Sequence, residues 1–251
     1  MELVFLGTGG FHPNERRHTA SIMLPEVGVV FDAGTSFFRM PGYLKTRQLQ
    51  IFLTHGHLDH ICGLTFPIVP LLSDVLDSIE VFGNPRTLTA VNDRLFSEEV
   101  FPVPLPKTEF RELPETVELP GGGVLSHCKL EHPGGAVGYR IDWPDHSLAY
   151  ITDTVAPGEY IDFIKGVDFL IHECYFPDDM AEWAIKTGHS HTTPVVQLAK
   201  EAGVGRLALV HIDPQRPGDD PVDIRKAQSI FPNTFIAEDK MTIEIGARAT
   251  L

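Results

Sequence analysis

Three imidazoles and one carboxylate fall within six consecutive positions of this chain, in the run Thr54-His55-Gly56-His57-Leu58-Asp59-His60. In an extended stretch residues i and i+2 point the same way, so His55 and His57 can bind one ion as a pair. Asp59 and His60 follow after the chain has turned, and they can bind a second ion. Imidazole and carboxylate together favour Zn²⁺ or a similar transition metal, whereas Ca²⁺ and Mg²⁺ prefer oxygen ligands. The run therefore predicts a metal site.

The surrounding sequence places this run on a loop. Residues 49–53 form a short apolar stretch that predicts a buried strand ending just before the run. Further histidines and acidic residues lie at the ends of later predicted strands, namely His132, Asp153, His172, Glu173 and His211. Because strand ends on a rigid sheet bring together residues that are far apart in sequence, these side chains are candidates to complete the site.

Charge and composition limit the classes of function. The 251 residues are 43% hydrophobic and 22% charged, as in an ordinary globular protein. The net charge of -14 repels polyanions at long range and argues against a general nucleic-acid binder. The basic segment at residues 14–18 is either a local phosphate contact or a solvated turn.

Apolar runs and cysteine spacing bear on the location of the protein and on its redox chemistry. No apolar run approaches the ~20 residues that span a bilayer, and residues 1–7 lack the features of a signal peptide, so we expect no membrane partner and a cytoplasmic protein. The three cysteines, Cys62, Cys128 and Cys174, are widely spaced, which predicts neither a disulfide framework nor a cysteine zinc site.

Hydrophobic periodicity and turn residues divide the chain into two runs of short strands, each followed by helices. Strands are expected at residues 2–6, 20–24, 27–32, 49–53, 78–82, 123–130, 137–142, 147–152, 168–172, 206–211 and 241–245. Helices are expected at residues 63–75, 86–97, 159–165, 178–187, 193–203 and 221–230. Residues 101–120, with five prolines, are expected to form an irregular connection. This grouping predicts one α/β domain over residues 1–251, with two sheets face to face and helices outside.

Taken together, these motifs resemble the metallo-β-lactamase fold hydrolases, and the resemblance covers nearly the whole chain. It rests on the HxHxDH run, the single His132 before Pro133, the turn Thr152-Asp153-Thr154 and the late strand-end His211. Within that superfamily the chain is most similar to the ribonuclease Z branch, the tRNA 3′-processing endonucleases. The residues that carry this likeness are Phe5-Leu6-Gly7-Thr8-Gly9-Gly10 with Pro13 and Arg16-Arg17, Ile171-His172-Glu173, Gly188-His189-Ser190 and Leu209-Val210-His211-Ile212.

The resemblance implies a four-layer αββα sandwich with two mixed sheets, and it implies a role for each site residue. One ion would be held by His55, His57 and His132, the other by Asp59, His60 and His211, with Asp153 bridging them. Glu173 and His189 would form a catalytic dyad outside the metal ligands. The implied cofactors are two divalent ions, with Zn²⁺ preferred and Mn²⁺ or Fe²⁺ as alternatives. A homodimer is also implied.

Two departures from the ribonuclease Z pattern bear on the substrate. The family's long arm, which grips tRNA, would follow the lone histidine ligand, but the connections from His132 to Asp153 and on to His172 are short. The second departure is His191, which stands where the family has threonine after the Gly-His-Ser turn. His191 is either an additional active-site histidine or a surface residue.

The predicted function is a dinuclear metal-dependent hydrolase, of the phosphodiesterase type. Two bound ions would supply hydroxide at neutral pH, and this hydroxide would attack phosphorus. Asp59 would orient it, and His189, held by Glu173, would protonate the leaving group. The substrate would be a small diester, a cyclic nucleotide or an RNA 3′ end. The alternatives are a tRNA 3′ endonuclease proper, an ester, thioester or lactone hydrolase, and a non-haem iron redox protein of the same fold.

Overall fold

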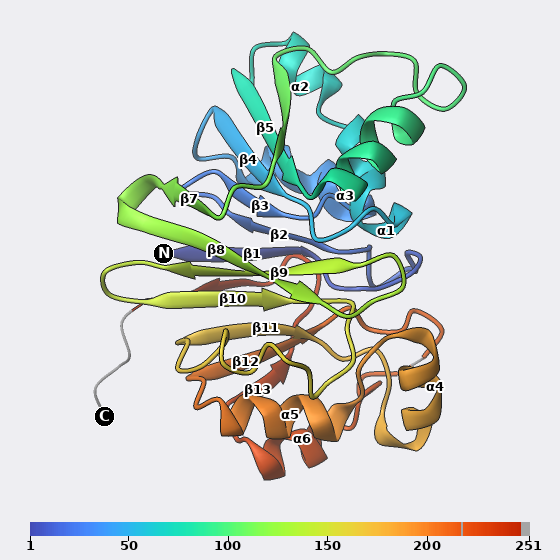
Figure 1. Ribbon diagram of the computed structural model, residues 1–251, viewed down its shortest axis with the longest axis vertical. Helices are drawn as coiled ribbons and strands as arrows, with labels where there is room; N and C mark the ends of the chain where they lie inside the picture. The colour runs from blue at the N-terminus through green and yellow to red at the C-terminus, as the bar shows by residue number, and fades with distance from the viewer. Residues whose placement is uncertain (217, 247–251) are drawn as a thin grey trace. The chain divides into compact units, whose positions relative to one another are not determined.

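The computed structural model describes residues 1–216 and 218–246. The described part of the chain divides into two compact units, unit 1 with Met1–Pro114 and Glu238–Glu244, and unit 2 with Glu115–Ala237 together with Ile245 and Gly246. Each unit contains one mixed sheet of seven strands (Figure 1). The expected α/β class with two mixed sheets is confirmed, and the single domain over residues 1–251 stays a prediction.

The sheet of unit 1 is half antiparallel and half parallel. Its strands in spatial order are β14 (Thr242–Glu244), β1 (Glu2–Gly7), β2 (Ser21–Leu24), β3 (Val29–Phe31), β4 (Gln48–Phe52), β5 (Ser78–Gly83) and β6 (Thr108–Glu112). The pairings from β3 to β6 are parallel, and they set Phe31 beside Phe52 and Phe52 beside Phe82. The carboxyl ends of these strands therefore meet at one edge, and the predicted metal-binding run begins there, two residues after β4.

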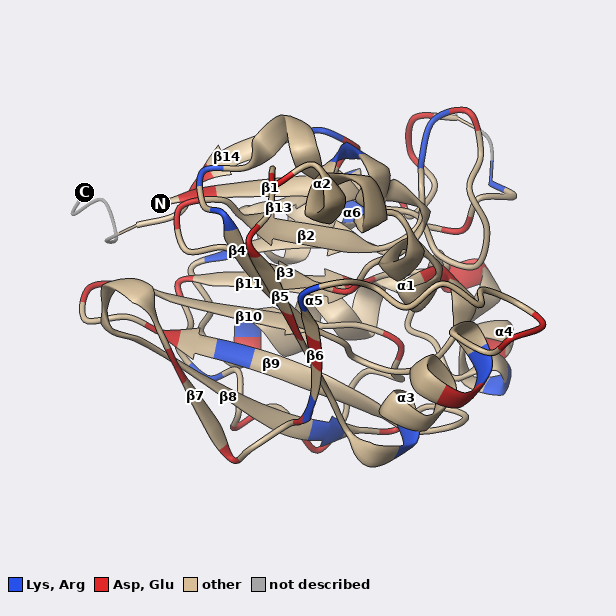
Figure 2. Ribbon diagram, turned by 90° about the horizontal axis from the view of Figure 1, so that it is seen from above, with Lys and Arg blue, Asp and Glu red and all other residues tan. Residues whose placement is uncertain are grey.

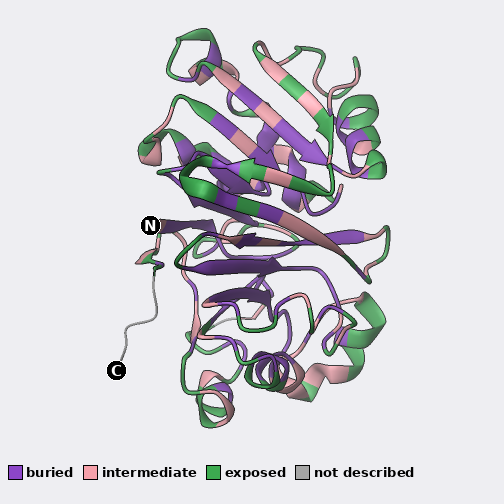
Figure 3. Cartoon of the chain, turned by 60° about the vertical axis from the view of Figure 1, so that its left-hand side comes forward, coloured by how far each residue is buried: buried purple, intermediate pink, exposed green. Residues whose placement is uncertain are grey.

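Short helices follow the strands of unit 1. They are η1 (Thr35–Tyr43), α1 (Leu58–Ile61), η2 (Cys62–Thr65), α2 (Ile68–Leu72), α3 (Pro85–Thr89) and the π-helical η3 (Ala90–Leu95). The core between them and the sheet is fully buried around Leu6, Phe37, Ile51 and Leu64 (Figure 3). The expected helix at 63–75 is thus broken in two, because Pro67 lacks the N–H that a continuous helix would need.

The sheet of unit 2 has the same division. Its strands in spatial order are β13 (Thr234–Ile236), β12 (Arg206–Val210), β11 (Phe169–Glu173), β10 (Ser147–Ile151), β9 (Ala136–Asp142), β8 (Gly123–Leu130) and β7 (Thr116–Leu119). In the parallel half Ile151 pairs with His172, and Glu173 with Val210. This register brings the chain just after β10, the last residue of β11 and the first residue after β12 to one edge.

Helices also follow the strands of unit 2. They are η4 (Pro120–Gly122), η5 (Asp178–Met180), α4 (Ala181–Thr187), α5 (Thr192–Glu201) and α6 (Ile224–Ile230), and α5 and α6 lie beside β12 and β13 in Figure 1. α5 buries Val195, Val196 and Leu198 in the core. Between His132 and Asp153 the chain forms only the β9–β10 hairpin, so the expected absence of a long arm is confirmed there.

Two expected elements are wrong. Residues 101–120 are not all irregular, because they contain β6 and β7, each the last strand of its sheet; the prolines flank these short polar strands rather than interrupt them. Residues 159–165 form hydrogen-bonded turns instead of a helix, with Phe163 and Ile164 N–H donating to Tyr160 O. Seven residues confined between Gly158 and Gly166 offer little propagation to offset helix nucleation.

Among the described residues, no helix is both long and apolar enough to cross a membrane. Figure 2 shows the Asp and Glu positions and the Lys and Arg positions interspersed along the ribbons.

Candidate metal centre

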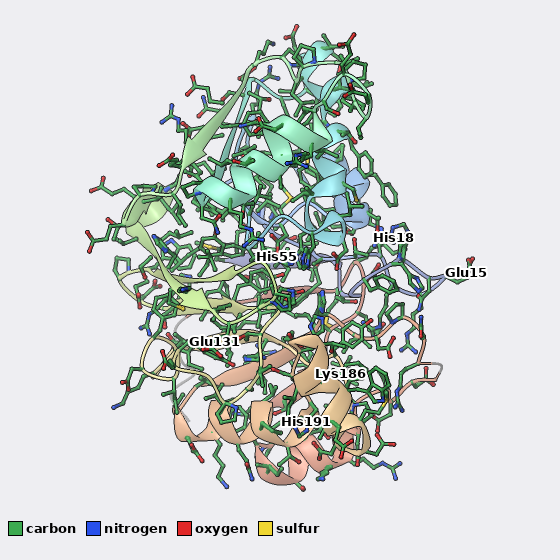
Figure 4. All side chains as sticks on the ribbon, turned by 45° about the vertical axis from the view of Figure 1, so that its right-hand side comes forward. Glu15, His18, His55, Glu131, Lys186 and His191 are labelled. Carbon is green, nitrogen blue, oxygen red and sulfur yellow. The ribbon has the colours of Figure 1, made fainter. Side chains whose placement is uncertain are left out.

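In unit 1 the predicted run forms a tight cluster of rings at the end of β4. The ring centroid of His55 lies 4.4 Å from that of His57 and 4.3 Å from that of His60. Asp59 Oδ2 lies 3.4 Å from His60 Nε2. His55 and His60 are buried, and His57 is exposed (Figure 4 labels His55). Four donors of the type that binds transition metals are therefore gathered on the loop after β4 and the start of α1.

Asp32 organises this loop from the neighbouring strand end. Its carboxylate accepts hydrogen bonds from Thr54 N and Oγ1 and from His60 Nδ1, the last at 2.8 Å. Since Nδ1 of His60 donates to Asp32, the ring presents Nε2 as its ligand nitrogen. Sequence reasoning missed Asp32 and Thr54, although Asp32 is the last residue of the expected strand at 27–32 and so lies at a strand end, as Asp153 does.

In unit 2 Asp153 lies between two histidines. Its Oδ2 is 3.7 Å from His132 Nε2, and its Oδ1 is 3.3 Å from His211 Nε2. The Nδ1 of His132 donates to Gly188 O at 3.0 Å, which directs Nε2 toward the carboxylate. All three side chains are buried. The two oxygens of one carboxylate thus face two different ligand nitrogens.

Glu173 and His189 form the expected dyad. Glu173 Oε1 accepts a hydrogen bond from His189 Nδ1 at 3.0 Å and from Thr154 N at 2.7 Å, while Oε2 accepts one from Ser190 N at 3.0 Å. The three hydrogen bonds to this buried carboxylate all come from N–H donors. The carboxylate fixes the tautomer of His189 and leaves Nε2 as the nitrogen that can exchange a proton with a substrate.

Two other rings, those of Tyr175 and His211, stack against the ring of His189. Tyr175 stacks on it with centroids 4.8 Å apart and planes 21° from parallel, and His211 lies 5.3 Å away at 27°. One ligand atom each of Asp153, His189 and His211 lies within 4.8 Å of the others, so the histidine of the dyad lies beside the candidate ligands. Sequence reasoning missed Tyr175, because only the fold places it against the histidine.

Strained backbone is found at several of these strand ends. Eight non-glycine residues in the described part of the chain have a positive φ, and four of them are Phe11, Asp32, Asp153 and His211. Side chains with a Cβ are disfavoured in this conformation. Two of the four, Asp153 and His211, are candidate ligands at strand ends, and strained backbone of this kind is often found at functional sites.

Two other histidines have structural roles. His172 is fully buried: its Nδ1 donates to Glu173 O, and its Nε2 accepts a hydrogen bond from Tyr160, both at 2.7 Å. Burial lowers the pKa of His172, which favours the neutral ring. His191 Nδ1 lies 2.6 Å from Asp178 Oδ1, which also accepts from Thr193 N at the start of α5. The structure places neither histidine among the candidate ligands.

The basic segment at residues 14–18 is partly exposed, with Arg16 at the surface and Arg17 buried, and both arginines form an ion pair within unit 1. Arg16 and Arg17 both bind the Glu238 carboxylate at 2.7 Å, and Arg17 is 3% exposed. Figure 4 shows Glu15 and His18 on the loop that carries them. These guanidinium groups are used within unit 1.

Both the sequence and the fold of this chain are similar to those of known proteins. Residues 28–212 match the β-lactamase superfamily domain. A ribonuclease Z of Gloeothece citriformis is 30% identical over 306 aligned positions, which cover 98% of this chain and 96% of that protein. Since this chain has only 251 residues, that relative contains segments without a counterpart here.

Two solved structures share the fold. The metallo-β-lactamase fold protein YhfI of Bacillus subtilis has a TM-score of 0.82 at 21% identity, covering 97% of this chain and 99% of its own. The short form of human tRNase Z has a TM-score of 0.76 at 21% identity, covering 98% and 99%. The expected metallo-β-lactamase fold is thereby confirmed.

Proposed function

The chain belongs to the β-lactamase superfamily, within the group of proteins named ribonuclease Z, and from this premise we propose that it is a dinuclear metal-dependent phosphodiesterase. Membership makes it a metal-dependent hydrolase. The phosphodiesterase mechanism and the number of ions are the proposed parts.

The observation that carries the proposal is the position of Asp153. Its two oxygens face His132 Nε2 and His211 Nε2 separately, as a carboxylate that bridges two ions would require. Unit 1 would complete the ligand set with imidazoles and a carboxylate of the same chemistry. One ion would be held by His55, His57 and His132, and the other by Asp59, His60 and His211.

The chemistry divides between the ions and the protein. When bound, two divalent ions lower the pKa of water and polarise phosphoryl oxygens. Asp59, whose Oδ2 is fixed by Phe11 N–H at 2.9 Å, would orient the attacking water and accept its proton. His189 would donate a proton from Nε2 to the leaving alkoxide, and Glu173 would stabilise the imidazolium that this step requires.

The dyad supports a diester substrate over a lactam. An alkoxide is a poor leaving group and needs a positioned acid, which His189 and Glu173 supply. With a net charge of -14 and no long arm after His132, the chain is better suited to a small diester, a cyclic nucleotide or a short RNA 3′ end than to a folded tRNA. A tRNA 3′ endonuclease proper is the second candidate, favoured by the activity that the relatives' names state.

A substrate panel tests the proposal. Protein loaded with Zn²⁺, Mn²⁺ or Fe²⁺ is assayed on bis(p-nitrophenyl) phosphate, 2′,3′-cyclic nucleotides, a tRNA precursor, and ester, thioester and lactone substrates. We expect cleavage of the diesters and little cleavage of the precursor. Precursor cleavage at the 3′ side would make the endonuclease the primary activity. Hydrolysis confined to carboxyl esters, or activity only as a redox iron protein, would overturn the proposal.

The homodimer and the cytoplasmic location stay predictions from the sequence.

A further inference from the structure

Phe11, on the loop between β1 and β2, combines two features that are each unusual for its residue type. Its side chain is 64% exposed, although phenylalanine is ordinarily buried. Its φ is 58°, in the left-handed region that an aromatic residue seldom adopts. His12 N–H donates to Gly10 O at 2.7 Å, so Phe11 is the central residue of a three-residue γ-turn. With a positive φ at its centre, this γ-turn is of the rare and strained type.

The loop around Phe11 is well anchored, so its exposure does not come from a slack chain. Gly9 N–H donates to His18 O at 2.9 Å, and Asn14 N–H donates to Arg17 O at 2.8 Å. Arg17 Nη1 also donates to Thr8 Oγ1. The strained turn is therefore held in place by its surroundings.

The turn is coupled directly to the candidate metal centre. Phe11 N–H donates to Asp59 Oδ2 at 2.9 Å, so the turn aims one backbone donor at the carboxylate expected to orient water. A glycine would supply the same N–H without strain. The contact between Phe11 N–H and Asp59 therefore explains the turn. It does not explain why the residue at the centre of the turn carries an exposed aromatic ring.

We propose that the Phe11 ring is a stacking surface for a nucleobase, and that the enzyme prefers nucleoside phosphodiesters over diesters without a base. This inference rests on the proposed function. An uncharged aromatic face binds any base through its π-surface and needs no attraction from the acidic protein. The neighbouring His12 ring, edge-on with centroids 4.9 Å apart, supports the ring from one side.

Two esters with the same leaving group test this preference. Zn²⁺-loaded protein is assayed on thymidine 5′-(p-nitrophenyl phosphate) and on methyl p-nitrophenyl phosphate, and the ratio of the two kcat/KM values is the readout. Phe11→Gly keeps the N–H and the backbone conformation while removing the ring. We expect it to lower this ratio roughly tenfold or more, mainly through KM for the nucleoside ester. Phe11→Tyr should preserve the ratio.

Control variants and a binding measurement complete the test. Phe38→Ala removes another exposed ring of unit 1, 52% exposed, and should leave the ratio unchanged. Phe11→Asn, which tolerates a positive φ, replaces Phe11→Gly if the latter folds poorly. By calorimetry, thymidine 5′-monophosphate should bind the Phe11→Gly protein roughly tenfold more weakly than the wild type.

The outcomes separate this inference from the proposed function. If the wild-type protein cleaves neither ester, the proposed function fails. The stacking role is tested separately by binding, and it is overturned if Phe11→Gly leaves the Kd for thymidine 5′-monophosphate unchanged. If Phe11→Gly lowers kcat equally on both esters, Phe11 acts only through Asp59 and the nucleobase assignment is wrong. An unchanged ratio overturns it too.

Discussion

Asp32 Oδ2 accepts a hydrogen bond from His60 Nδ1 at 2.8 Å, and neither side chain is exposed to solvent. A carboxylate in this position fixes the tautomer of the histidine and makes Nε2 a stronger ligand. We predict that Asp32→Asn weakens metal affinity by ~10- to 100-fold. Competition with a chromogenic chelator measures the affinity, and an unchanged value would show that Asp32 acts only on folding.

His57 is the exposed member of the ring cluster, so its replacement should disturb folding little. His57→Ala is expected to remove one bound metal ion and nearly all hydrolysis, because a three-residue ligand set loses one donor. Metal content by mass spectrometry and the rate on bis(p-nitrophenyl) phosphate are measured together. His127→Ala, on β8 and outside the candidate ligands, is the control; equal losses in both variants would contradict the assignment.

The proton donor is tested through the leaving group. His189→Ala should retain both ions yet lower turnover by ~10²–10⁴ on an alkyl diester, since an alkoxide needs protonation. The p-nitrophenolate group leaves without a proton, so bis(p-nitrophenyl) phosphate should be affected far less. Equal rates for wild type and variant on the alkyl diester would rule out the general-acid role.

His191 and Asp178 connect the segment before α4 to the start of α5. Burial alone would raise the pKa of Asp178, but hydrogen bonds from Lys226, Thr193 and His191 outweigh it and hold the pKa well below its ordinary value. A lowered pKa means that the native state disfavours protonation of Asp178. Its contribution to stability is present above the ordinary pKa near 4 and is lost as the pH falls through the native value.

We therefore predict that His191→Ala lowers the free energy of unfolding at pH 7 by about 1–2 kcal/mol and leaves metal content and kcat unchanged. For Asp178→Asn, the stability difference from wild type should shrink as the pH is lowered from 5 toward 2. Urea unfolding at several pH values provides both numbers. A loss of bound metal in His191→Ala would instead make this histidine part of the metal centre.

The sequence predicted most of the strands because their apolar runs are bounded by turn residues, as at residues 123–130, and it identified the HxHxDH run by residue type alone. It could not predict β6, where a polar edge strand lies among prolines, nor the part played by Asp32, whose partner is 28 residues away. His172 shows the opposite error. It stands at a strand end like a ligand, but the period of the strand turns it into the core, where Tyr160 binds it.

The most direct test is a titration of metal-free protein with Zn²⁺ while hydrolysis of bis(p-nitrophenyl) phosphate is followed. We predict that the rate rises to a plateau at two Zn²⁺ per chain. Asp153→Ala should bind Zn²⁺ more weakly and show almost no hydrolysis at the same ratio. A plateau at one ion per chain, or hydrolysis that does not respond to metal, would contradict a dinuclear phosphodiesterase.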